Sequence, residues 1–67
     1  MKSISGKKLA QILEKKGWIL VKTRGSHFKY QKCSDSVAVP IHGNRDLPIG
    51  TLKSIMKDAN LKEEDLL

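Results

Sequence analysis

A chain of 67 residues is short enough to form one small domain with a marginal core, and its single cysteine, Cys33, cannot form an internal disulfide. We therefore expect one domain over residues 1–67, held by packing alone in a reducing compartment. No apolar run approaches the roughly 18 residues that a membrane span needs. The first residues also lack the apolar segment of a signal peptide, so the sequence predicts a cytoplasmic protein.

The net charge of +6 is concentrated in the first half of the chain. Residues 1–32 hold nine lysines and arginines against one acid, whereas residues 33–67 hold four against six acids. A small domain with one basic half is typical of proteins that bind a polyanion, most often nucleic acid. Charge alone is equally compatible with a solvated lysine-rich surface.

Residues 3–17 form the first predicted helix, because apolar residues recur there at the spacing of one helical face. This stripe consists of Leu9, Ile12 and Leu13. Ser5 is a suitable N-cap, and Gly17 suits the left-handed position after the last turn. Lys7 and Lys8 lie in the first turn, where the helix dipole favours acids, so they are either phosphate ligands or two solvated lysines.

Three strands are predicted next, over residues 18–23, 27–32 and 37–42. In the second and third strands, apolar and polar residues alternate, so one face should be covered and the other open to solvent. The covered face would carry Phe28, Tyr30, Val37, Val39 and Ile41. The open face would carry His27, Lys29, Gln31, Ala38, Pro40 and His42. Because Pro40 cannot donate a hydrogen bond to a neighbouring strand, the third strand should lie at the edge.

A second helix should follow the loop of residues 43–46, with Pro48 at its first position and Asn60 at its C-cap. Its apolar stripe would comprise Ile49, Leu52, Ile55, Met56 and Ala59. Residues 61–67 can form one more helical turn. Each helix has a single apolar face, so the simplest arrangement is an α+β fold of order α-β-β-β-α, with both helices on one face of a three-stranded antiparallel sheet.

A four-residue hairpin loop, Cys33 to Ser36, would pair every apolar residue of the second strand with an apolar residue of the third. In that register His27 lies directly opposite His42. Arg24 and Arg45, in the flanking loops, would lie near the same end. A single histidine at a strand end is usually an ordinary surface residue, but a pair in a basic domain favours a functional site. A metal pair is a weaker alternative, since only Asp46 could supply a third ligand and no cluster has zinc spacing.

Three stretches of the sequence resemble the HicA toxins, which are small bacterial mRNA interferases encoded beside a HicB antitoxin. The stretches are "SGKKLAQILEKKGW", "RGSHFKY" and "VPIHGNRDLPIGTLKSIMKDANL". The resemblance covers roughly residues 3–62, and its most specific parts are the Gly-Ser-His before the second strand and the "P-x-H-G … L-P-x-G-T-L" block. The chain departs from the family at Lys8, Phe28 and Asn60, which are not motif residues.

The resemblance implies a double-stranded-RNA-binding-domain-like fold and cleavage of RNA, with His27 as the essential catalytic residue. It also implies a HicB-type antitoxin as partner. We expect no cofactor. From the residues themselves, we expect Lys22, Arg24 and Lys29 to contact phosphates. The site would further include amides of Gly25 and Ser26, a second acid/base or supporting role for His42, and RNA contacts from Lys7, Lys8 and Arg45. The rival hypotheses are a double-stranded-RNA-binding module without chemistry and a basic face that docks an acidic protein.

Overall fold

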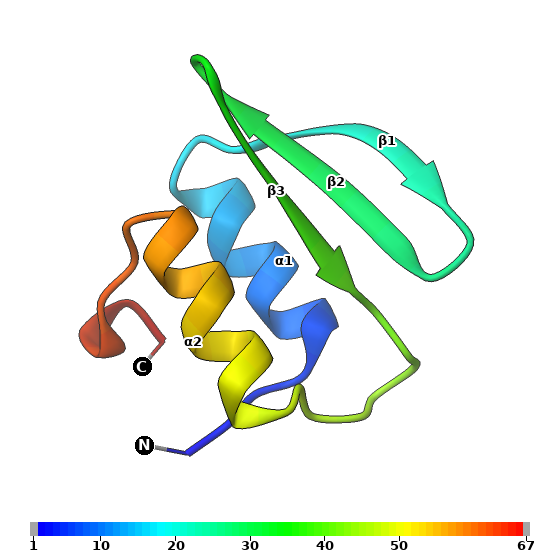
Figure 1. The fold of residues 1–67 in the computed structure, drawn as a ribbon, viewed down its shortest axis with the longest axis vertical. Coiled ribbons are helices and arrows are strands. Elements are labelled where there is room, and N and C mark those ends of the chain that lie inside the picture. Colours follow the sequence, from blue (N-terminus) through cyan, green and yellow to red (C-terminus); the bar gives the residue numbers. More distant parts are fainter. Residues whose placement is uncertain (1, 67) are drawn as a thin grey trace.

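The computed structural model describes residues 2–66 and contains two helices packed on one face of a three-stranded antiparallel sheet (Figure 1). The elements are α1 (Gly6–Lys15), β1 (Ile19–Arg24), β2 (His27–Lys32), β3 (Asp35–Pro40), α2 (Ile49–Asp58) and a 3-10 helix, η1 (Glu63–Leu66). The strands are ordered β1-β2-β3, so β3 is an edge strand, as Pro40 predicted. The predicted α+β class and element order are confirmed.

The predicted capping of α1 is confirmed, although the helix is shorter than residues 3–17. The backbone N–H of Lys8 donates to the Ser5 hydroxyl at 3.1 Å, which satisfies one free amide of the first turn. The chain leaves the helix through Gly17, at a φ of 99° that favours glycine. The Lys32 ammonium donates to the carbonyl of Lys16 at 2.8 Å and so binds the negative end of the helix dipole.

Helix α2 differs from its prediction at both ends by one residue. Pro48 is the N-cap rather than the first helical residue, and Ala59 is the C-cap. Asn60 follows in the left-handed region, with a φ of 57°. The expected apolar stripe is buried except for Ile49, which lies in the first turn and is 38% exposed. The extra helical turn predicted near the C-terminus is η1, and Leu67 lies outside the described residues.

The turn between β2 and β3 is tighter than predicted, which changes the register. Lys32 pairs with Asp35, so only Cys33 and Ser34 form the loop, and Cys33 takes a left-handed φ of 55°. The third strand was predicted at 37–42, but it begins and ends two residues earlier, at Asp35–Pro40. A shift of two keeps every side chain on its predicted face, and for this reason the apolar pattern could not distinguish the registers.

A β-bulge in β1 decides which side chains share the open face of the sheet. Leu20 pairs with Tyr30 and Lys22 with Lys29, so Val21 is the extra residue. In a regular strand, Lys22 would lie on the same face as Leu20. The bulge instead turns Lys22, and with it Arg24, toward the face away from the helices. Each residue of β1 is exposed, since the strand lies at the edge of the sheet farthest from α2.

The core lies between the sheet and the helices, and Tyr30 is its largest fully buried side chain. Buried around it are Leu9, Leu13, Trp18, Val37, Val39, Leu47, Leu52, Ile55 and Met56. The Tyr30 hydroxyl donates to the Glu14 carboxylate of α1 at 2.9 Å. Burial, together with the hydrogen bond and the negative charge of Glu14, raises the pKa of Tyr30 to about 12.

The raised pKa of Tyr30 predicts a loss of stability at alkaline pH. The unfolded phenol ionises near 10, while the folded one keeps its proton until about 12. Unfolding therefore becomes easier as the pH rises from 10 to 12, and this contribution is fully present below pH 10. Urea unfolding of the protein and of Tyr30→Phe at pH 8, 10 and 11.5 measures the effect. The phenylalanine variant should lose less stability across this window, and an equal loss in both proteins would contradict the assignment.

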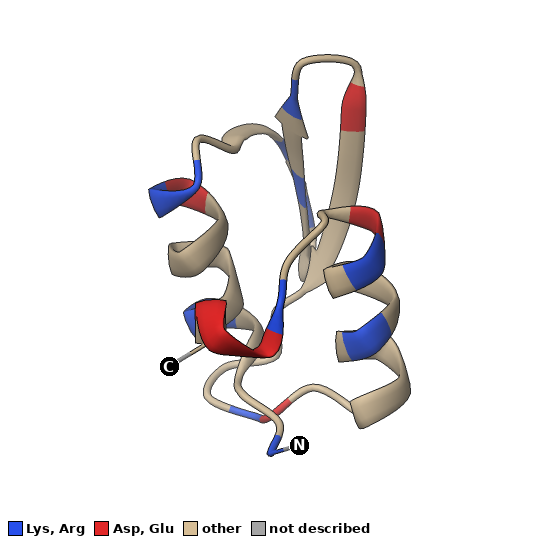
Figure 2. Ribbon diagram, turned by 90° about the vertical axis from the view of Figure 1, so that its left-hand side faces the viewer, with Lys and Arg blue, Asp and Glu red and all other residues tan. Residues whose placement is uncertain are grey.

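The acidic residues of η1 lie on the helix side of the molecule, in front of the helices in Figure 2, with the sheet behind them. Lys16 forms an ion pair with Asp65 at 2.8 Å and joins η1 to the end of α1. The Lys16 ammonium, aided by the backbone N–H of Lys62, holds the pKa of Asp65 below its usual value. None of the helices within residues 2–66 is long and apolar enough to span a membrane.

Candidate active site

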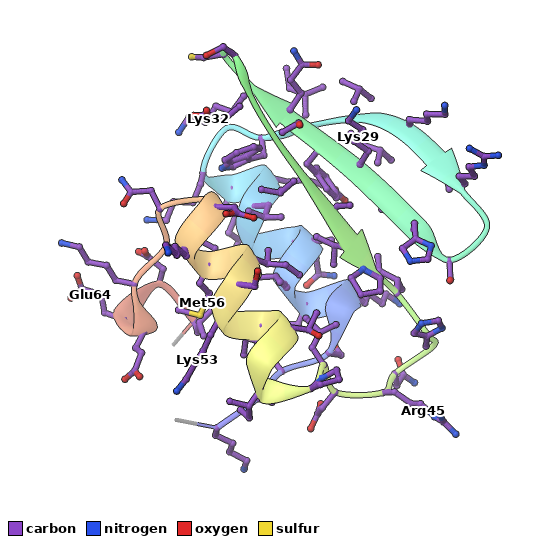
Figure 3. All side chains as sticks on the ribbon, viewed as in Figure 1. Lys29, Lys32, Arg45, Lys53, Met56 and Glu64 are labelled. Carbon is purple, nitrogen blue, oxygen red and sulfur yellow. The ribbon has the colours of Figure 1, made fainter. Side chains whose placement is uncertain are left out.

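The sheet face away from the helices carries a basic surface, which we call the outer face. The cross-strand pairs place two rows of side chains on it, Arg24–His27–Pro40 and, beside it, Lys22–Lys29–Ala38. Strand pairing holds each neighbour about 5 Å away at Cβ. The described strand residues of this face include no acid. Figure 3 shows Lys29 on the sheet, whereas Lys32 extends toward the end of α1. Of the two lysines of β2, Lys29 therefore belongs to the outer face, and Lys32 binds the helix end.

The turn that connects β1 and β2 holds His27 at the end of the outer face. Gly25 and Ser26 form this turn, and Gly25 has a φ of 58°, where a side chain would be strained. The carbonyl of Ser26 accepts a hydrogen bond of 2.7 Å from the backbone N–H of Ile41. The turn is therefore fixed to the chain just beyond β3. The His27 side chain is exposed, so an imidazole on a well-held backbone faces solvent.

The start of α1 packs directly against the end of β3, where the chain is joined to the turn between β1 and β2. A Cβ added to Gly6 would lie far inside van der Waals distance of the Pro40 carbonyl oxygen and 3.2 Å from the Cα of Ile41. Gly6 is buried, and no larger residue fits there without separating the helix from the strand. This close approach sets the position of Pro40, the cross-strand neighbour of His27.

The loop between β3 and α2 places the other predicted residues beyond the end of the sheet. The backbone N–H of Arg45 donates to the carbonyl of His42 at 3.1 Å, which closes a turn. Asp46 forms a single bridge with Ser5, so the loop also joins the start of α1. Arg45 projects from this loop away from the helices (Figure 3). His42 and Arg45 line a pocket of about 300 Å³ together with Pro40, Asp46, Leu47, Pro48 and Thr51.

The predicted pairing of His27 with His42 is wrong, because His27 is opposite Pro40. The tight turn at Cys33 shifts β3 by two residues, and His42 consequently lies outside the strand. The structure does bring together Lys22, Arg24, Gly25, Ser26, His27 and Lys29. Lys7 and Lys8 lie at the start of α1, where Lys8 lines a separate hollow with Asn44 and Asp46.

Three residues near the site were not predicted to belong to it. Pro40 was placed on the open face but not beside His27, and a two-residue hairpin turn would have shown the pairing. Asp46 was considered only as a metal ligand, and Thr51 only as part of the second helix and of the "L-P-x-G-T-L" block. No group of three or more His, Cys, Asp or Glu side chains within residues 2–66 is arranged to hold a metal ion.

The site combines one imidazole, several cations and a tight glycine-containing turn on an open surface. This combination can bind a phosphate chain and transfer a proton beside it. Comparison with curated proteins found no match. A family model described as "HicA toxin of bacterial toxin-antitoxin" matches residues 6–61, which is most of the chain. The chain therefore belongs to the HicA toxin family of bacterial toxin–antitoxin systems.

Proposed function

We propose that this toxin is an endoribonuclease that cleaves mRNA with His27 as its acid/base residue, and that a HicB-type antitoxin neutralises it. The observation that carries the proposal is the position of His27. It lies on the outer face, whose described strand residues include no acid, between Arg24 and Pro40 and next to the Lys22–Lys29 row. Such a surface attracts a phosphate backbone, and an imidazole within it can act as general base or acid.

RNA carries its own nucleophile, so the proposed reaction needs only proton transfer and charge stabilisation. His27 takes the proton of a 2′-hydroxyl, and the 2′-oxygen attacks the adjacent phosphorus. The bond from phosphorus to the 5′-oxygen breaks, and the 5′-oxygen takes up a proton from solvent or from His27. The products are a 2′,3′-cyclic phosphate and a 5′-hydroxyl. General acid–base catalysis by one group contributes roughly 10²–10⁴-fold, and stabilisation of the developing charge by the neighbouring cations adds to it.

The cations have a separate role in this proposal. Arg24 is the cross-strand neighbour of His27, so its guanidinium can bind the phosphate under attack and stabilise the charge that develops on it. Lys22 and Lys29 lie one row farther along the face and would bind the next phosphates. Amides of the Gly25–Ser26 turn can add hydrogen bonds to the same phosphate, as the sequence predicted.

A double-stranded-RNA-binding module without chemistry is the second candidate. It is favoured because His27 lies on an open surface and not inside a cleft. His27 lines neither of the hollows at this end of the molecule, of about 610 and 300 Å³. A flat basic face can bind a duplex through shape and phosphate contacts alone. The two candidates differ in whether His27 is required for the loss of RNA.

Expression of the chain alone in bacteria tests the proposal. We expect growth arrest with degradation of mRNA, and rescue by co-expression of the antitoxin. Arg24→Gln should weaken both effects, while Lys57→Gln, which removes one positive charge from the far end of α2, serves as the matched control. Growth arrest without RNA cleavage by the purified chain would instead support the binding module.

A further inference from the structure

We propose that the pocket between the β3–α2 loop and the first turn of α2 is a subsite for one unpaired nucleobase, next to the phosphate on which His27 acts. This inference rests on the proposed function, because it names the part of the RNA that the same site selects. It also gives His42 a role other than proton transfer, and it specifies the RNA contact expected of Arg45.

The position of the pocket relative to His27 follows from the strand pairing. Pro40 is the cross-strand neighbour of His27 and also forms part of the pocket wall. Directly paired residues of antiparallel strands have Cα atoms roughly 4.5–5.5 Å apart. Pro40 therefore links His27 to the pocket, as the direct neighbour of the one and part of the wall of the other. A nucleotide bound at His27 by its phosphate would have its base, or the next one, at that mouth.

The chemistry of the lining suits a base better than a phosphate. His42 and Arg45 offer planar groups, and splayed RNA bases stack on histidine rings and guanidinium planes. Asp46 adds a carboxylate, which repels phosphate but accepts hydrogen bonds from base N–H groups. This carboxylate takes part in none of the ion pairs or side-chain hydrogen bonds among residues 2–66. An acceptor that the fold does not use remains available for a ligand.

The size of the pocket restricts the ligand to a small group. Its volume of about 300 Å³ is at the lower end of the range for ligand sites. A base inside a duplex cannot leave its stack without the loss of pairing and stacking energy. The pocket therefore favours single-stranded RNA, in contrast to the duplex that a flat basic face would bind. The Thr51 hydroxyl, in the first turn of α2, can donate or accept one more hydrogen bond.

Binding of uncleavable RNA tests the subsite without relying on catalysis. We would use 2′-O-methyl hexanucleotides that differ in the base at one position, with an abasic residue as the fifth version, and scan the position along the strand. At one position we expect the preferred base to bind at least roughly five-fold more tightly than the abasic version, as stacking and hydrogen bonds to one base imply. Equal affinity for all five versions at every position would overturn the inference.

Three variants test where the selectivity is located. Thr51→Tyr would fill the pocket, and Ser54→Tyr introduces the same side chain one turn later on an exposed position of α2. Thr51→Tyr should remove the base preference, and Ser54→Tyr should keep it. Asp46→Asn, which adds a donor, should change the preferred base. Thermal unfolding of each variant confirms that it is folded.

The outcomes separate this inference from the proposed function. If the wild-type protein selects a base but cuts no RNA, the ribonuclease proposal fails and the subsite stands. If it cuts RNA while Thr51→Tyr and Asp46→Asn keep the wild-type base preference, the subsite is wrong and the ribonuclease stands.

Discussion

His27→Ala is expected to lower the rate of RNA cleavage by roughly 10²–10⁴-fold, the contribution of one general acid–base group. The side chain is exposed and lies outside the core, so its removal should leave the fold intact. Expression of the variant should no longer arrest growth. Cleavage is measured with the purified chain on an end-labelled RNA, alongside urea unfolding of the same samples.

The matched control for His27→Ala is Gln31→Ala. Gln31 lies on the same strand and the same outer face, two rows of paired residues away from His27. This control variant should retain full cleavage. His42→Ala is the informative comparison, since the subsite assigns base binding to this residue: it should still cleave RNA but with weaker selection of sites. An equal loss of cleavage for His27→Ala and Gln31→Ala would contradict the assignment of His27.

Gly6→Ala is expected to destabilise the protein more than any exposed substitution. The new methyl group would meet backbone atoms of Pro40 and Ile41, which cannot rotate away as a side chain can. Overpacking of this kind typically costs about 1–3 kcal/mol, a large part of the stability of a small domain. Because Pro40 is the neighbour of His27, cleavage should also decrease. Urea unfolding in the His27→Ala background, which avoids toxicity during expression, measures the stability.

Gly50→Ala is the control for this substitution. Gly50 lies in the first turn of α2, and a Cβ there meets no atom within 4 Å. Alanine is favoured over glycine in a helix by roughly 0.5–1 kcal/mol, so this variant should be slightly more stable than the parent. A Gly6→Ala variant as stable as Gly50→Ala would show that α1 does not depend on the close approach to β3.

Local signals in the sequence predicted most of the fold. The apolar stripes of the two helices, the Ser5 cap and the alternation in β2 and β3 each depend on neighbours a few residues away, and the structure confirms them. Pro40 likewise predicted an edge strand from a single residue, because it has no N–H to donate to a neighbouring strand. The element order then left few ways to bury both helix faces, and the observed arrangement is the simplest of them.

The registers of the sheet were harder to predict. The turn at Cys33 places a non-glycine residue at a positive φ, which nothing in "CSDS" indicates. The β2–β3 register moved by two residues, a change to which the apolar pattern is insensitive. The bulge at Val21 was also unforeseen, although it decides that Lys22 and Arg24 share a face with His27. Both features depend on pairing between strands rather than on the sequence of one strand.

The candidate site was therefore predicted in part. Arg24, Ser26 and His27 were expected together because the turn itself joins them. His42 was expected opposite His27 only through the register, and that expectation was wrong. The pocket beside Pro40 was not foreseen, although its walls come from the continuous stretch of residues 40–51, because no local pattern in the sequence shows how the chain turns between β3 and α2.

The ends left by RNA cleavage test the central claim most directly. The purified chain, in EDTA, is given an RNA that it cuts at one position and the same RNA with a single 2′-deoxy sugar on the 5′ side of that position. The proposed chemistry predicts a 2′,3′-cyclic phosphate and a 5′-hydroxyl from the first RNA and no cut at that position in the second. A product with a 5′-phosphate, or equal cleavage of both RNAs, would contradict attack by the 2′-hydroxyl and point to an activated water instead.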